Sequence, residues 1–111
     1  VERKGFLAHR ARKRLAELGI ANVQIETADG TLGFPAQAPY AGIIVTAEAP
    51  KIPDSYLDQL TIGGRLVIPV SGPAGTILLR IVRSGQQQWE EEALMRCCFV
   101  PLIGQAGYPA P

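Results

Sequence analysis

A stripe of apolar residues recurs at helical spacing near the start of the chain and predicts an amphipathic helix over residues 4–18. The stripe consists of Leu7, Ala11, Leu15 and Leu18. Gly19 suits the left-handed residue that ends such a helix. Residues 22–26 then alternate between polar and apolar side chains, which predicts a short strand with one buried face.

Two later segments have the pattern of buried parallel strands. Residues 42–46 are almost entirely apolar and rich in β-branched side chains, which is typical of a strand covered on both faces. Residues 65–70 form a second apolar run, and Pro69, which has no backbone N–H, is expected to interrupt pairing near its end. Between the two runs, Pro53 suits the first turn of a short helix.

Two more strand-like runs, 76–82 and 89–100, flank Ser84-Gly85 and predict an antiparallel hairpin. Strand and helix alternate before it, so the sequence predicts an α/β fold with a doubly wound sheet, mostly parallel with a C-terminal antiparallel hairpin. The Gly/Pro-rich residues 105–111 are expected to be a loose tail. Ligands of such sheets bind in loops beyond the carboxyl ends of the parallel strands. These loops follow Ile25, Val45 and Val70.

Composition narrows the class of protein without naming a function. The 111 residues are 47% hydrophobic and 19% charged, which favours one globular domain over disorder. No apolar run approaches the roughly 18 residues of a membrane helix, and no signal peptide opens the chain, so we expect a soluble, intracellular protein. Cys97 and Cys98 are adjacent. They provide neither a disulfide framework nor the spaced ligands of a zinc site, so no metal is predicted.

Charge is unevenly distributed along the chain. The first fourteen residues hold six of the eleven basic residues and one acidic residue. A basic helix of this kind can meet phosphates, but we favour the simpler interpretation that it has a solvated outer face. His9, the only histidine, lies among these arginines and is expected on the surface. Glu90-Glu91-Glu92, which follows Trp89, is likewise interpreted as a solvated face.

Two loops are candidates for chemistry, although the chain contains no GxGxxG, GxxxxGK[ST], HExxH or GxSxG motif. Thr46-Ala47-Glu48-Ala49-Pro50 follows a buried strand with small residues, which lets a ligand approach the backbone. Taken alone, the loop is also compatible with an ordinary connection between a strand and a helix. Asp29-Gly30-Thr31 follows another strand. Asp29 can accept a hydrogen bond from a nucleoside there, or it can form an Asx-turn.

Five segments around these loops occur in one order and at natural spacings. They are Ala28–Pro35, Ala38–Tyr40, Ile43–Pro50, Gly63–Val70 and Phe99–Leu102. Together they resemble the C-terminal portion of protein-L-isoaspartate O-methyltransferases, over nearly the whole chain. The resemblance implies that residues 1–104 are the C-terminal part of a class I, Rossmann-like methyltransferase domain. Such an enzyme uses S-adenosylmethionine to methylate the carboxylate of L-isoaspartyl residues in damaged proteins, and the ester then collapses to a succinimide.

The resemblance also implies roles for individual residues. It assigns cofactor binding to Glu2, at the ribose hydroxyls, to Asp29 and Gly30, beside the adenine, and to Thr46 and Ala47. It assigns substrate binding to Ala49, Phe99, Val100 and Pro101, with the main chain near Val100 receiving the isoaspartyl peptide. Departures from the family pattern are Ala41, Cys97-Cys98 and Glu48. Glu48 replaces the usual alanine and adds a negative charge beside a pocket for a carboxylate.

The family's glycine-rich loop and its catalytic hydroxyl residue would lie before residue 1. We therefore expect the 111 residues alone to be inactive and to self-associate. The expected partners are isoaspartyl-containing proteins and peptides, with neither nucleic acid nor membrane, in the cytoplasm. Two alternatives stay open at this point: another class I methyltransferase with a different acceptor, and a noncatalytic interaction module on the same scaffold.

Overall fold

Helix α1 (Gly5–Glu17) is the main element of the first of two units, Val1–Gly30 and Thr31–Pro111, into which the chain divides. The structure is a computed structural model and describes residues 1–111. The predicted helix is thus confirmed, and Gly19 follows it with a left-handed φ of 70°. Ala8 is the one buried residue of α1.

Residues 22–26 do not form the predicted strand. In their place one parallel bridge joins Glu2 to Thr27. The amide of Glu2 donates to the carbonyl of Glu26 at 2.8 Å, and the amide of Ala28 donates to the carbonyl of Glu2 at 3.1 Å. A strand needs a partner of several residues to form a ladder. Within this unit the partner contributes a single residue, so the pairing stays a bridge.

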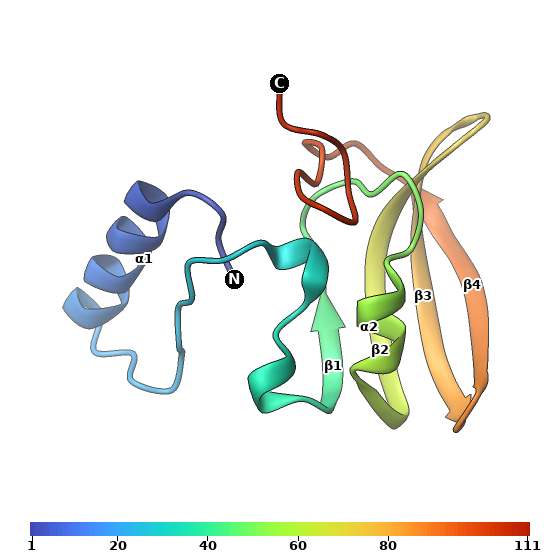
Figure 1. Ribbon diagram of the computed structural model, residues 1–111, viewed down its shortest axis with the longest axis horizontal. Coiled ribbons are helices and arrows are strands. Elements are labelled where there is room, and N and C mark those ends of the chain that lie inside the picture. The colour runs from blue at the N-terminus through green and yellow to red at the C-terminus, as the bar shows by residue number, and fades with distance from the viewer. The chain divides into compact units, whose positions relative to one another are not determined.

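A four-stranded sheet forms the second unit (Figure 1). Its strands are β1 (Tyr40–Ile44), β2 (Leu60–Gly72), β3 (Gly75–Gly85) and β4 (Gln88–Arg96), in that spatial order. Helix α2 (Asp54–Asp58) lies in the connection from β1 to β2 and begins directly after Pro53, where the sequence predicted a short helix. Two short 3₁₀-helices, Gly30–Leu32 and Pro35–Gln37, precede β1.

The sheet is mixed, whereas the sequence predicted a mostly parallel one. Strands β1 and β2 are parallel, and β2, β3 and β4 are antiparallel to their neighbours. The reason is the length of the connections, because the two-residue turns after β2 and β3 permit only antiparallel pairing. The α/β class and the C-terminal antiparallel hairpin are as predicted. No helix of the structure is long and apolar enough to cross a membrane.

Pro69 leaves the pairing of β2 with β3 intact, and the interruption predicted near it lies on the other side of β2, where the register with β1 ends at Val67. Pro69 is paired with Leu78, and the register continues to Gly72. The carbonyl of Pro69 faces the opposite side, where it accepts from Ala49. Because the N and C=O of one residue in a strand point the same way, the missing N–H also falls on that side. The ladder to β3 therefore loses nothing.

The core of this unit lies between α2 and one face of the sheet. Leu66 and Ile68 alternate along β2, are fully buried, and stand opposite Ile81 and Leu79 of β3. Figure 1 shows α2 in front of β2, which is the strand it packs against. The remaining buried members of the core are Val45, Ala49, Tyr56 and Leu60.

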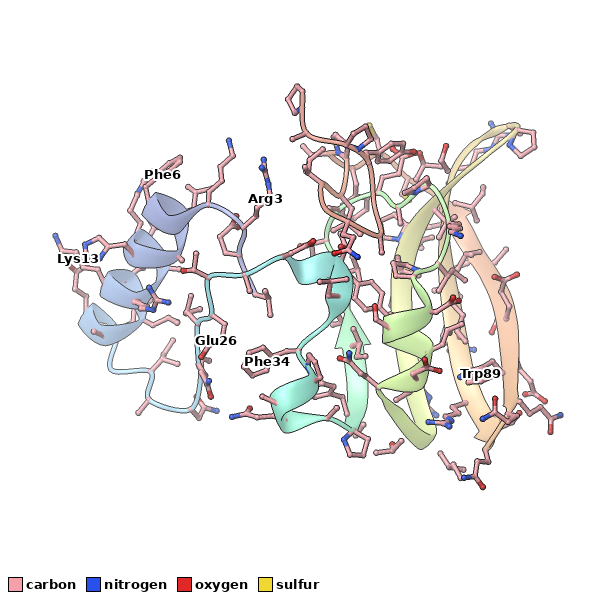
Figure 2. The ribbon with its side chains drawn as sticks, in the orientation of Figure 1. Arg3, Phe6, Lys13, Glu26, Phe34 and Trp89 are labelled. Carbon is pink, nitrogen blue, oxygen red and sulfur yellow. The ribbon has the colours of Figure 1, made fainter.

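Arg83 and Trp89 tie the β3–β4 hairpin to the end of α2. The indole Nε1 of Trp89 donates to the carbonyl of Leu57 at 3.3 Å, and the side chain is labelled in Figure 2. The guanidinium of Arg83 donates to the carbonyl of Leu60 at 2.6 Å and lies 5.5 Å from the centroid of the Trp89 ring. A cation such as the Arg83 guanidinium is favourable at the carbonyl end of a helix. Arg83 and Trp89 therefore supply hydrogen-bond donors to carbonyls at the end of α2 that a five-residue helix cannot satisfy itself.

The chain after Gly104 makes hydrogen bonds to earlier residues as far as Tyr108. The amide of Tyr108 donates to the carbonyl of Leu102 at 2.8 Å, and that of Ala106 to the hydroxyl of the fully buried Thr31 at 3.0 Å. A Cβ on Gly107 would lie 2.3 Å from the oxygen of Leu102. The glycine there permits a close turn.

Candidate functional site

Ala49 extends the edge of β2 after β1 has ended. Strand β1 stops at Ile44. Five residues later the amide of Ala49 donates to the carbonyl of Pro69, and its carbonyl accepts from the amide of Ser71, both at 2.9 Å. Ala49 is fully buried. The loop after β1 is therefore fixed against the carboxyl end of β2, where two of the predicted ligand-binding loops meet.

Glu48 joins the same loop to the C-terminal segment of the chain. Its amide donates to the carbonyl of Val100, and its carbonyl accepts from the amide of Leu102, both at 2.7 Å. This pattern is a parallel bridge between Glu48 and Pro101. The loop thus lies as a short extended segment between β2 on one side and residues 100–102 on the other.

The two sides of this loop have different exposure. Neighbouring residues in an extended segment point to opposite faces, so the buried Ala49 faces the core and the half-buried Glu48 faces the other way. Pro101 is paired with Glu48, and residues paired in register project to the same face. Phe99, two residues before Pro101, shares that face by the same alternation.

The outer edge of the C-terminal segment is open. Because Val100 and Leu102 direct their bonds to Glu48, the main-chain groups of Phe99 and Pro101 point away from it. Neither residue makes a backbone hydrogen bond. Val100 between them has 69% of its surface exposed. An extended peptide can add to such an edge as a further strand.

In the first unit the structure brings Glu2 and Asp29 to the same end of a parallel pair. Glu2 is bridged to Thr27, and Asp29 follows two residues later. One carboxylate oxygen of Glu2 accepts from the amide of Lys4 at 2.9 Å, just before α1. Gly30 is close to the chain start, since a Cβ there would lie 3.8 Å from Cγ1 of Val1.

The predicted site residues therefore form one group within each unit. Glu2, Asp29 and Gly30 lie together in Val1–Gly30. In Thr31–Pro111, the exposed Thr46 and half-buried Ala47 lead directly into the ladder described above. The other members of that second group are Ala49, Phe99, Val100 and Pro101.

Other residues singled out in the sequence are on the surface. His9 and Glu90–Glu92 are exposed, as predicted. Cys97 is half-buried and Cys98 exposed, and both are free thiols. No group of three or more His, Cys, Asp or Glu side chains lies together as a metal site.

Gln59 is a residue that the sequence analysis missed. Its side-chain oxygen accepts from the amide of Phe34 at 2.9 Å, and its nitrogen donates to the carbonyl of Leu32 at 3.0 Å. Gly33 between them has a φ of 67°, and a Cβ there would lie 2.2 Å from Oε1 of Gln59. The only local signal was this glycine, which gave no indication of its distant partner. Figure 2 labels Phe34 in this loop.

A family model described as "Protein-L-isoaspartate(D-aspartate) O-methyltransferase (PCMT)" matches residues 1–107. The chain belongs to this family. The resemblance noted from its sequence segments is thereby confirmed. This chain is 49% identical over 108 residues to a protein-L-isoaspartate O-methyltransferase of Syntrophotalea carbinolica and 47% identical to one of Magnetococcus marinus. Each match covers 97% of this chain but only 50% and 47% of the relative. The chain thus spans about half the length of these relatives.

Solved structures agree on the fold. One, from Plasmodium falciparum, is described as a putative protein-L-isoaspartate O-methyltransferase in complex with S-adenosyl-L-homocysteine. It matches with a TM-score of 0.80 and 22% identity, over 92% of this chain and 50% of that one. A second protein-L-isoaspartate O-methyltransferase matches with a TM-score of 0.84 and 24% identity, over 94% of this chain and 33% of that one. The α/β fold is therefore a part of the Rossmann-like methyltransferase fold.

Proposed function

We propose that this chain is part of an enzyme that transfers a methyl group from S-adenosylmethionine to the carboxylate of L-isoaspartyl residues, as a step in protein repair. One observation carries the proposal beyond family membership. The loop after β1 is clamped between β2 and residues 100–102, and this leaves the main chain of Phe99 and Pro101 open at the edge. The proposed partners are isoaspartyl-containing proteins and peptides, in the cytoplasm.

The acceptor is proposed to bind by strand addition along Phe99 and Pro101. Main-chain hydrogen bonds give such binding its affinity, and Pro101 offers only a carbonyl whereas Phe99 offers both groups. The isoaspartyl carboxylate, with a pKa near 4 in model peptides, is already ionised at pH 7. The task of the chain is therefore to align this nucleophile and to exclude water from it. The small side chains of Ala47 and Ala49 leave room for the reacting groups.

The residues of the first unit fit the nucleoside part of the cofactor. Carboxylate oxygens accept hydrogen bonds from ribose hydroxyls and from an adenine amino group. The Glu2–Thr27 bridge brings Glu2 and Asp29 to one end of a parallel pair, and the bond from Lys4 orients the Glu2 carboxylate. Glu2, Asp29 and Gly30 are proposed to hold the nucleoside. Thr46 and Ala47, in the loop after β1, are separately proposed as cofactor-binding residues. The cofactor, when bound, supplies an electrophilic methyl group.

A chimera tests the proposal. Residues 1–107 replace the matched part of the Syntrophotalea carbinolica relative, and methyl transfer to an isoaspartyl peptide is compared with transfer to its normal aspartyl isomer. We expect methylation of the isoaspartyl peptide alone. Equal methylation of both isomers, or none by a chimera that still binds S-adenosylhomocysteine, contradicts the proposed acceptor.

The cofactor residues are tested in the same chimera by calorimetry. Asp29→Ala should weaken the binding of S-adenosylhomocysteine by about 1–3 kcal/mol, the cost of a lost hydrogen bond to a charged group. Glu90→Ala is the matched control, since it removes an exposed carboxylate from β4. If the two variants bind alike, Asp29 is not a cofactor ligand.

A further inference from the structure

Glu48 carries a carboxylate that has no partner in the chain. Its main chain is fully used by Val100 and Leu102, but its side chain makes no hydrogen bond or ion pair. Lys51, three residues further along, is exposed and does not pair with it. The residue is half-buried. The main chain of Glu48 is therefore fixed, while its carboxylate has no cation beside it to neutralise its charge.

The register fixes where this charge lies relative to the open edge. Glu48 is paired with Pro101 and shares a face with Pro101 and Phe99. A peptide added along the outer edge would be the next strand on the far side of Pro101. Strands are spaced by about 4.8 Å, so its main chain would run roughly 10 Å from that of Glu48. The side chain of a Lys or Arg in the peptide and that of Glu48 can meet across this distance, above Pro101.

We infer that Glu48 sets the charge preference of the acceptor site, favouring isoaspartyl peptides that carry Lys or Arg beside the isoaspartyl residue and disfavouring those that carry Glu or Asp. The inference rests on the proposed function, because it uses the same edge. Pro101 is uncharged and offers no N–H, so it does not compete with the peptide cation for the carboxylate of Glu48. The acceptor itself brings a negative carboxylate, and each further acidic side chain on this face adds repulsion.

The size of the effect follows from the exposure of the site. Glu48 is only half-buried, so water and salt screen its interaction with a peptide cation. For such a pair we expect the affinity for a Lys-containing peptide to exceed that for its Ala counterpart by about threefold, and a Glu-containing peptide to bind about threefold more weakly than the Ala peptide. Raising the salt concentration to about 1 M should remove most of the difference.

The experiment measures peptide binding to the chain within the chimera described above by NMR, from the shifts of the Phe99 and Leu102 amide signals. One Lys, Ala or Glu is moved through the two positions on either side of an isoaspartyl residue. The wild-type chain is compared with Glu48→Gln, which keeps the shape and removes the charge. Glu90→Gln is the matched control, because it removes an exposed charge on β4.

Each outcome decides a separate point. A Lys over Glu preference that disappears in Glu48→Gln and persists in Glu90→Gln supports the inference. Equal binding of all peptides to the wild-type chain, or a preference unchanged in Glu48→Gln, overturns the role of Glu48 and leaves the acceptor edge standing. If no peptide, whatever its charge, shifts the two amide signals, the acceptor edge of the proposed function is wrong and the inference falls with it.

Discussion

The two helices of the chain show that length and amphipathic pattern do not decide how firmly a helix is held. Helix α1 has thirteen residues and a clear apolar stripe, yet within its unit it buries only Ala8. Helix α2 has five residues, buries Tyr56, and receives hydrogen bonds on its last carbonyls from Arg83 and Trp89. The difference is the presence of a partner surface, since burial and satisfied helix ends stabilise a helix more than its own propensity does.

The largest expected effect is in the core of the second unit. Leu66→Ala should lower the free energy of unfolding by about 3 kcal/mol, because it leaves a cavity beside Ile68 and Ile81. Leu18→Ala, at a side chain that is 66% exposed, should change it by less than about 0.5 kcal/mol. Urea denaturation followed by the fluorescence of Trp89, the only tryptophan, measures the first variant, and far-UV circular dichroism, which also reports α1, measures the second. Equal losses of unfolding free energy would mean that both leucines are packed to the same extent, contrary to the comparison above.

An intermediate effect is expected where α2 meets the hairpin. Arg83→Ala removes the donors to Leu60 and to the end of α2, together with the contact to Trp89, and should cost about 2 kcal/mol of unfolding free energy. Arg83→Lys should recover less than half of this loss, because an ammonium group cannot reproduce the geometry of the guanidinium.

Arg80→Ala is the control for that experiment, measured in the same urea titration. Arg80 lies on the same strand and pairs with Glu92 at the surface. An exposed pair of this kind is worth less than about 1 kcal/mol. If Arg80→Ala lowers the free energy of unfolding as much as Arg83→Ala does, the hydrogen bonds of Arg83 to the end of α2 do not explain the effect.

The smallest effect is expected in the first unit. The guanidinium of Arg12 donates to the carbonyl of Ile25 at 2.9 Å and to the hydroxyl of Thr27 at 3.4 Å. Arg12→Ala should therefore loosen the Glu2–Thr27 bridge by about 0.5–1 kcal/mol. Faster hydrogen exchange of the Ala28 amide, by roughly twofold to fivefold, would report this.

Arg10→Ala is the matched variant on the same helix, and it should leave the exchange of Ala28 unchanged. Urea unfolding followed by Trp89 should be unaffected by either variant, because the tryptophan belongs to the second unit. Equal acceleration in both variants would trace the effect to the net charge of α1 and not to the bonds of Arg12.

Elements with a strong local signal were predictable. The stripe of Leu7, Ala11, Leu15 and Leu18 indicated α1, and Ser84-Gly85 between two apolar runs indicated the hairpin. Two outcomes depended on distant partners. Residues 22–26 alternate like a strand but find only Glu2 as a partner, and the sequence did not say on which side of β2 the missing N–H of Pro69 ends the pairing.

The sequence by itself determined the family, the places of α1, α2 and the hairpin, and two loops that contain some of the candidate site residues, because each depends on residue type and spacing within a short stretch. Only the tertiary structure decided that Glu48 and Ala49 lie between Pro69–Ser71 and Val100–Leu102, and that Thr31 and Gln59 anchor distant backbone. These contacts join residues 20 to 75 positions apart. No local pattern encodes such pairs, since they form only when strand register and the packing of the core bring the backbone groups together.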